Sequence, residues 1–119
     1  MDAQNLSKRL AAVAAQVPKG SRLADIGSDH AYLPAHLLMA QQIDFAVAGE
    51  VVEGPFENML KEVEHRGLAD HLLPRLANGL DAIRKEDRID TIAIAGMGGA
   101  LITKILDAGQ EKLEGVKRL

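Results

Sequence analysis

Apolar residues along the chain follow two spacings, one typical of helices and the other of strands. Leu6, Leu10 and Val13 lie three or four positions apart. This spacing predicts an amphipathic helix over residues 5–16, which ends before the sequence PKG. The stretch SRLADIG that follows, residues 21–27, is short and mostly apolar, and it predicts a buried strand.

The pattern continues as strands that alternate with helices. Pro34 suits the first turn of a helix because its missing N–H has no partner there, so a helix is expected over residues 33–42. A second strand is expected in DFAVAGEV, residues 44–51, and the helix after it opens at the sequence GP and stops near Gly67. The apolar face of that helix consists of Phe56, Met59, Leu60 and Val63.

Two more strands and one more helix follow. HLLPRLA, residues 71–77, and IDTIAIAG, residues 89–96, predict the third and fourth strands. The last helix starts after GMGG and is capped by Gly109. The apolar face of this last helix consists of Leu101, Ile102, Ile105 and Leu106. Alternating strands and helices imply right-handed βαβ units and a parallel sheet, so the expected fold class is α/β.

Pro74 indicates the strand order. Proline lacks a ladder donor and is confined to edges or bulges, so the third strand belongs at an edge. A doubly wound sheet in the order 3-2-1-4 meets this requirement. In a complete fold of this kind further strands lie beyond the fourth, whereas the chain stops at EGVKRL. We therefore expect residues 1–119 to be the front part of a longer protein, or a truncated form, whose exposed fourth strand could pair with a second copy of the chain.

Composition narrows the class of protein. With 119 residues, 47% hydrophobic and 26% charged, the chain is expected to form one soluble globular domain. It has no cysteine, which excludes disulfides and thiolate-bound zinc and suits a cytoplasmic protein. No signal peptide or membrane-spanning run is recognisable, and no spacing of His and carboxylates predicts a metal site. A net charge of −3 provides no overall attraction to nucleic acid.

The loop after the first strand, DIGSDHAYLP, resembles a dinucleotide-binding turn but carries acids where further glycines are expected. Asp29 would place a negative charge against the pyrophosphate of NAD. S-adenosylmethionine has no phosphate and carries a sulfonium and an ammonium, so Asp25 and Asp29 suit this cofactor better. The alternative is that Asp29 only caps the next helix and that Asp25 only stabilises the turn.

Three further strand ends offer ligand-binding residues at the carboxyl edge of the sheet. Glu50, some twenty residues past Gly27, is placed to accept both ribose hydroxyls, although it could be a solvated strand end. Asn78 could hydrogen-bond an adenine, with Gly79 allowing close approach, but the pair could equally form an ordinary turn. The GMGG loop could approach the ligand closely, or Met97 could simply fill the core.

His30 and Tyr32 lie in the first loop, where either could touch cofactor or substrate, or serve only in capping and packing. For a nucleic acid the local candidate is an N-terminal basic stretch. The proposed substrate-binding residues are Lys8 and Arg9 of this stretch, together with Tyr32. A solvated helix face explains the same charges. The basic stretch consists of Lys8, Arg9, Lys19 and Arg22.

Five segments taken together resemble the bacterial tRNA (adenine-22-N1)-methyltransferase family. They are LSKRL, VPKGSRLADIGSDHAYLP, AGEVVEGPFENM, NGLDAI and TIAIAGMGGALITKIL. The resemblance implies a class I, Rossmann-like domain that binds S-adenosylmethionine, followed in the family by a helical C-terminal domain that this chain does not contain. It implies a methionine-end group, a ribose group, an adenine group and a group near the transferred methyl. They are, in that order, Asp25, Gly27, Ser28, Asp29 and His30; Glu50 and Val51; Asn78, Gly79 and Leu80; and Gly96, Met97 and Gly98.

Two departures from the family pattern stand out. Relatives commonly have aspartate where this chain has Asn78, and they continue with a strand carrying a QPN-type sequence that is absent here. The expected reaction needs little acid–base help, because N1 of adenine has an in-plane lone pair that can attack the methyl group directly. Asp29 is the one candidate catalytic residue, as a carboxylate that stabilises the cationic product.

Other functions remain open at this level. The same fold could methylate a small molecule, or the chain could be a non-catalytic module that binds the cofactor or dimerises. An NAD-dependent dehydrogenase is disfavoured by Asp29 and by the missing glycines.

Overall fold

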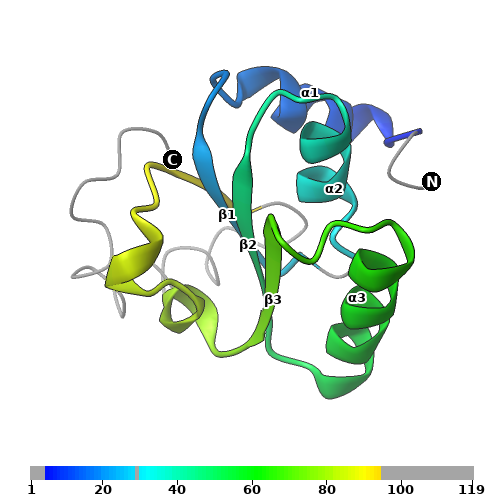
Figure 1. Ribbon diagram of the computed structural model, residues 1–119, viewed down its shortest axis with the longest axis vertical. Coiled ribbons are helices and arrows are strands. Elements are labelled where there is room, and N and C mark those ends of the chain that lie inside the picture. Colours follow the sequence, from blue (N-terminus) through cyan, green and yellow to red (C-terminus); the bar gives the residue numbers. More distant parts are fainter. Residues whose placement is uncertain (1–4, 29, 95–119) are drawn as a thin grey trace.

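The computed structural model describes residues 5–28 and 30–94. Within them, four parallel strands form one sheet in the order β3-β2-β1-β4 (Figure 1). The strands are β1 (Arg22–Ile26), β2 (Phe45–Glu50), β3 (Leu72–Leu76) and β4 (Thr91–Ile94). The predicted order is confirmed, and Pro74 lies in the edge strand β3 opposite Ala48 of β2.

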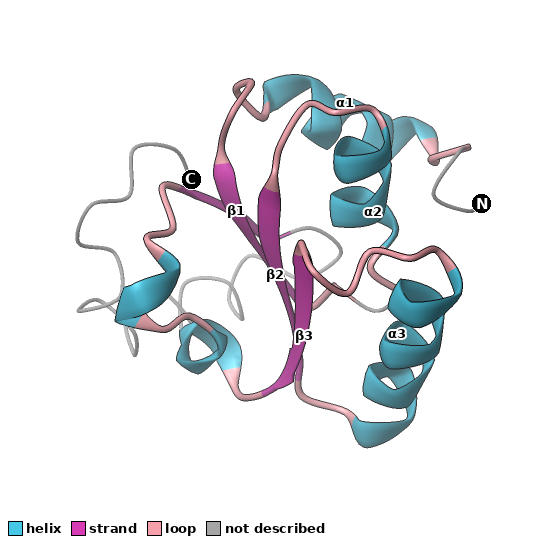
Figure 2. Cartoon of the chain, in the orientation of Figure 1, coloured by secondary structure: helices cyan, strands magenta, loops and turns pink. Residues whose placement is uncertain are grey.

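The two faces of the sheet are covered differently. The helices α1 (Lys8–Gln16), α2 (Tyr32–Met39) and α3 (Glu53–His65) lie on one side of it, and two short 3₁₀ segments lie on the other (Figure 2). These segments are η1 (Gly79–Ala82) and η2 (Lys85–Asp87), and neither was predicted. The sheet is therefore the middle of three layers.

Alternation along the strands explains the two layers of packing, because successive strand side chains point to opposite faces. In β1, Leu23 packs in the cluster that contains Leu37 of α2 and Met59 of α3. Its neighbour Ala24 packs in the other cluster, which contains Leu80 of η1. The residues of 79–83 are thus held against the sheet by apolar burial.

Several predicted boundaries need correction. The first helix begins at Lys8, where the hydroxyl of Ser7 accepts a hydrogen bond from the backbone N–H of Leu10 at 3.2 Å. The second helix ends at Met39, three residues before its predicted end, because Gln41 has φ 60°. On α3, Met59 and Val63 are buried as predicted and Phe56 packs against the core, but Leu60 is 44% exposed.

The end of the fourth predicted strand, the GMGG loop and the last helix lie outside the described residues. Within those residues no helix is long and apolar enough to cross a membrane.

Candidate functional site at the carboxyl edge of the sheet

Three neighbouring strands end at one edge of the sheet, and hydrogen bonds connect the segments that follow them. The backbone N–H of Ser28, after β1, donates to the carbonyl of Gly49 in β2 at 3.0 Å. The N–H of Ala77, after β3, donates to the carbonyl of Glu50 at 2.9 Å. The parallel strands therefore bring the predicted methionine, ribose and adenine groups to one edge, as expected for ligand sites of open α/β sheets.

Asp25 lies near the end of β1 and is 4% exposed. Burial raises the pKa of its carboxyl group from 3.8 to about 7, and the Ser28 hydroxyl, which donates to Oδ2 at 2.7 Å, offsets part of the rise. A cation beside this carboxyl would favour its ionised form. The group is therefore suited to receive an ammonium.

The turn after β1 depends on two residues with positive φ. Gly27 has φ +69° and Ala31, which caps α2, has φ 58°. Between this turn and the helix, the rings of His30 and Tyr32 stack with centroids 5.1 Å apart and an interplanar angle of 21°. These two side chains thus pack on each other, and Tyr32 is the first residue of α2.

Glu50 closes β2 with its side chain 9% exposed. Its Oε1 accepts hydrogen bonds from the backbone N–H groups of Val51 at 3.0 Å and Val52 at 3.1 Å. Two such bonds fix the orientation of the carboxylate, so Glu50 is a held acceptor rather than a solvated strand end. Val51 itself is 59% exposed at the same edge.

The segment after β3 turns at once into η1. Asn78 is exposed and precedes η1, Gly79 has φ +55°, and Leu80 is 2% exposed because it packs under the sheet. The positive φ explains the glycine, since other residues adopt this conformation with strain. The Asn78 side chain thus lies at the rim, supported by a buried leucine two residues later.

Two contacts that hold η1 were not predicted. The first is the β2–η1 contact, in which Gly49 approaches Ala82 so closely that a Cβ built on the glycine would lie 2.8 Å from the alanine Cβ. Real Cβ atoms essentially never approach a neighbour within 3.0 Å. A glycine inside an apolar strand is a sequence signal for a close approach, but only the fold identifies Ala82 as the neighbour.

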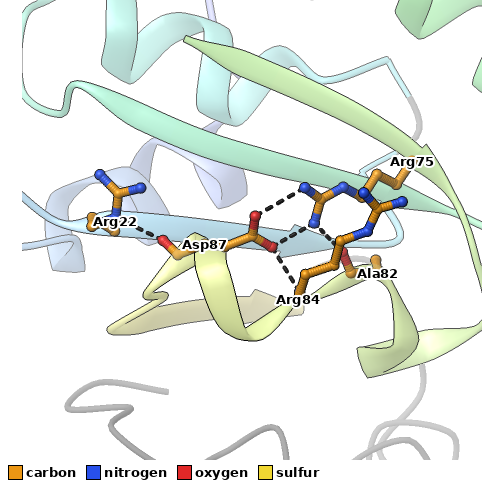
Figure 3. A network of polar contacts seen from close by, with 5 residues as sticks. All are labelled: Arg22, Arg75, Ala82, Arg84 and Asp87. Atoms are coloured by element: carbon orange, nitrogen blue, oxygen red, sulfur yellow. Dashed lines mark hydrogen bonds and ion pairs between the residues drawn. The ribbon is translucent and has the colours of Figure 1, made fainter.

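The second is a buried ion pair between Arg75 of β3 and Asp87 of η2, with side chains 13% and 3% exposed (Figure 3). Arg75 donates through Nη2 to Asp87 Oδ1 at 2.9 Å, and through Nη1 both to Asp87 Oδ2 and to the carbonyl of Ala82 at 2.8 Å. The backbone N–H of Arg84 donates to Asp87 Oδ2 at 2.7 Å. An arginine inside LLPRL is the one signal in the sequence for this pair.

The pKa of Asp87 reflects competing effects. Burial by itself raises it, but the hydrogen bonds from Arg75 and from the backbone of Arg84, with the charges of both arginines, outweigh burial and leave the pKa below its usual value. Asp87 is therefore ionised at neutral pH and paired. The backbone carbonyl of Asp87 also accepts from Arg22 Nε at 2.7 Å, which connects η2 to β1.

The basic stretch predicted for nucleic-acid binding is only partly available. Lys8 and Arg9 are exposed on α1, which lies at the end of the sheet where β1 and β2 begin, opposite the carboxyl edge (Figure 1). Arg22 is used within the fold, because it donates to Asp87 and lies over the Phe45 ring at 4.1 Å. The structure thus does not bring Lys8 and Arg9 to the cofactor residues, and it removes Arg22 from the proposed surface.

Four predicted site residues, Asp29, Gly96, Met97 and Gly98, lie outside the described residues. In the ranges 5–28 and 30–94, no three His, Asp or Glu side chains gather in a way that could hold a metal ion.

The strand order β3-β2-β1-β4 defines a doubly wound, Rossmann-like sheet. A solved protein of the NADB-Rossmann superfamily from Streptococcus agalactiae matches it with a TM-score of 0.93 and 56% identity, over 98% of this chain and 51% of that one. A family model described as TrmK, tRNA (adenine(22)-N(1))-methyltransferase, matches residues 23–119. The chain belongs to this family.

Two relatives carry the family's activity in their names. The tRNA (adenine(22)-N(1))-methyltransferase of Bacillus subtilis is 49% identical over all 119 residues, which correspond to 50% of that protein. A putative tRNA (m1A22) methyltransferase of Streptococcus pneumoniae, solved in complex with S-adenosyl-L-methionine, is 52% identical with a TM-score of 0.91. That match covers 94% of this chain and 52% of the other. The chain thus spans about half the length of the relatives that it matches.

Proposed function

We propose that the protein to which this chain belongs transfers a methyl group from S-adenosylmethionine to N1 of adenine 22 in tRNA. In this proposal the chain supplies the cofactor-binding part of the enzyme. The observation that carries it is the carboxyl edge, where three polar residues lie at or just past the ends of three neighbouring strands. They are buried Asp25, Glu50 with its held carboxylate, and the rim residue Asn78. Family membership supports the choice of substrate.

Each group has a defined part in binding the cofactor. The Asp25 carboxyl receives the ammonium of the methionine end, and its partner Ser28 keeps it oriented. Glu50 accepts the ribose hydroxyls, because its carboxylate is already fixed by the N–H groups of Val51 and Val52. Asn78, Gly79 and Leu80 border the adenine. A cofactor held at three points leaves the methyl group in one position, which is what an in-line transfer requires.

The chemistry at the target base fits a site without an acid–base pair. N1 of adenine carries an in-plane lone pair, so it attacks the sulfonium methyl without first losing a proton. The new bond forms between N1 and the methyl carbon while the bond from carbon to sulfur breaks, giving S-adenosylhomocysteine and a cationic base. Positioning and exclusion of water therefore supply most of the catalysis.

The decisive experiment uses the complete gene product with tRNA transcripts that carry either adenine or guanine at position 22. We expect 1-methyladenosine, detected by mass spectrometry of nucleosides, in the first transcript and none in the second. Methylation of both transcripts at other positions would contradict the proposal. Transfer to small metabolites without transfer to tRNA would favour the small-molecule alternative.

Asp29, which directly follows Ser28 in the sequence, is the residue we propose to stabilise the cationic product. An Asp29→Ala variant is expected to lower kcat by about 10²-fold, as loss of one electrostatic stabiliser commonly does. Normal turnover of that variant would remove Asp29 from the mechanism.

Lys8 and Arg9 remain the residues we propose for contacts with the tRNA backbone, on a surface separate from the cofactor residues. Charge reversal at both positions is expected to weaken tRNA binding and to reduce its dependence on salt. Unchanged affinity at several salt concentrations would show that Lys8 and Arg9 only form a solvated face of α1. Because the proposed substrate is tRNA, we also propose a cytoplasmic location for the protein.

A second copy of the chain is the partner we propose for the outer edge of β4. In the part of the chain that the structure describes, β4 pairs only with β1. An unpaired strand edge is available to another chain. Sedimentation of the 119-residue chain at increasing concentration is expected to show a dimer, and a monomer throughout would exclude it.

A further inference from the structure

The contacts around η1 concern the part of the site that is proposed to bind the adenosine of the cofactor. η1 begins at Gly79, directly after Asn78, and ends at Ala82. Its position relative to β2 therefore sets the distance between the segment proposed to border the adenine and Glu50, proposed to hold the ribose. Two contacts fix that position, one steric and one electrostatic.

The steric one is the β2–η1 contact. Gly49 immediately precedes Glu50, and a Cβ on it would lie 2.8 Å from the Cβ of Ala82. Since both atoms belong to short, rigid groups, neither can swing away as a long side chain would. Any side chain at position 49 would have to push η1 off the sheet.

The electrostatic one is the buried ion pair of Arg75 and Asp87. One guanidinium reaches both Asp87 oxygens and the carbonyl of Ala82, the last residue of η1 (Figure 3). The planar fork of arginine allows all three bonds at once, which lysine cannot reproduce. β3 thus holds η1 through Arg75, the residue that pairs with Gly49 in the register of β2 and β3.

We infer that the β2–η1 contact and the buried ion pair are specificity determinants of the cofactor site. They set the distance between Glu50 and the Asn78 segment, and thereby select a cofactor whose base is adenine. This inference rests on the proposed function. Adenine and hypoxanthine differ in the 6-amino group and in the proton on N1, so a rim segment held in one position distinguishes them by hydrogen bonding. A segment free to shift accommodates both.

The test compares binding of S-adenosylhomocysteine with that of its inosine analogue, by calorimetry on the complete gene product. We expect the unsubstituted protein to prefer the adenosine ligand by at least about tenfold, the equivalent of one hydrogen bond. Gly49→Ala should reduce this preference to less than about threefold. Gly49→Ala combined with Ala82→Gly should restore it, because the second change removes the atom that the new Cβ meets.

The matched control is Gly54→Ala, since a Cβ at that exposed position would meet nothing within 4 Å. It should leave both affinities unchanged. Arg75→Lys should lower the preference as Gly49→Ala does, because lysine cannot make the fork. A substitution that only lowers the folded fraction reduces the number of binding sites but leaves the ratio of the two affinities unaltered, so the ratio separates positioning from stability.

The outcomes are distinguishable. If the unsubstituted protein binds neither ligand, the proposed function fails and the inference fails with it. If that protein binds S-adenosylhomocysteine but Gly49→Ala keeps the full preference, only the inference is overturned. Equal affinity of the unsubstituted protein for both ligands would overturn it as well.

Discussion

At the scale of single residues, the carboxyl group of Asp25 departs from the ordinary behaviour of an aspartate. Its pKa in the folded protein is raised from 3.8 to about 7, mainly by burial. The folded state therefore binds more protons than the unfolded chain between about pH 4 and pH 7. Over that window the free energy of unfolding falls as pH rises, and above pH 7 the contribution of this group becomes constant.

In an Asp25→Asn variant the free energy of unfolding should not fall between about pH 4 and pH 7 for this reason. Asparagine stays neutral and can still accept the hydrogen bond from Ser28. Relative to the unsubstituted protein we expect a gain of up to roughly 4 kcal/mol in the free energy of unfolding at pH 8, and a smaller gain at pH 5. Urea unfolding at both pH values measures the difference, with Asp70→Asn, on an exposed loop, as the control. The same gain at pH 5 and pH 8 would show that Asp25 is ionised throughout.

The acids at the strand ends were predictable because their spacing follows directly from the order of strands along the chain. Asp25 is the second-last residue of β1 and Glu50 is the last residue of β2, and parallel strands bring such ends together. The ion pair of Arg75 and Asp87 was not predictable, because it joins residues 12 positions apart, one in a strand and the other in a 3₁₀ turn. Nothing local in the sequence marks either residue as the partner of the other.

At the scale of elements, the ends of α2 and α3 show why one helix end was predicted accurately and the other was not. Both helices end in the same motif, with Gln42 N–H donating to Leu37 O after α2, and Leu68 N–H donating to Val63 O after α3. The left-handed position is occupied by Gly67 in one and by Gln41 in the other. Gly67 predicted the end of α3, because glycine is common at this position, whereas Gln41 gave no signal in the sequence for the end of α2.

The same comparison yields a prediction for stability. Gln41→Gly should increase the free energy of unfolding by about 0.5–1 kcal/mol, because glycine adopts φ 60° without strain. Gly67→Ala should lower it by about 1 kcal/mol through the backbone alone, since a Cβ there meets nothing within 4 Å. Chemical unfolding of the two variants tests the pair. A loss of stability in Gln41→Gly would mean that residue 41 continues the helix.

At the scale of the whole molecule, the proposed ligand connects segments that are distant along the chain. Asp25 and Glu50 lie at the ends of β1 and β2, and Asn78 follows β3. Hydrogen bonds from Ser28 and Ala77 connect the segments after β1 and β3 to the end of β2. A ligand that contacts all three binds only the folded chain. Its binding energy is therefore added to the stability of the entire sheet.

This coupling can be measured as ligand-induced stabilisation of the complete gene product. At S-adenosylhomocysteine concentrations 100 times the dissociation constant, the free energy of unfolding should rise by about 2.7 kcal/mol, whereas NAD at the same concentration should leave it unchanged. The contrast follows from the ligands, since NAD would bring a pyrophosphate to the loop after β1, whose sequence carries Asp29 where NAD sites have glycine.

Glu50→Gln provides the variant that separates binding from folding. Glutamine keeps an oxygen that can accept from Val51 and Val52, so the unliganded variant should be about as stable as the unsubstituted protein. It lacks the charge that strengthens bonds from the ribose hydroxyls, which should weaken binding about tenfold. At the same ligand concentration its stabilisation should then fall to about 1.4 kcal/mol. Equal stabilisation of both proteins would show that Glu50 does not hold the ribose, and the fixed carboxylate would then serve only to cap the segment that leads into α3.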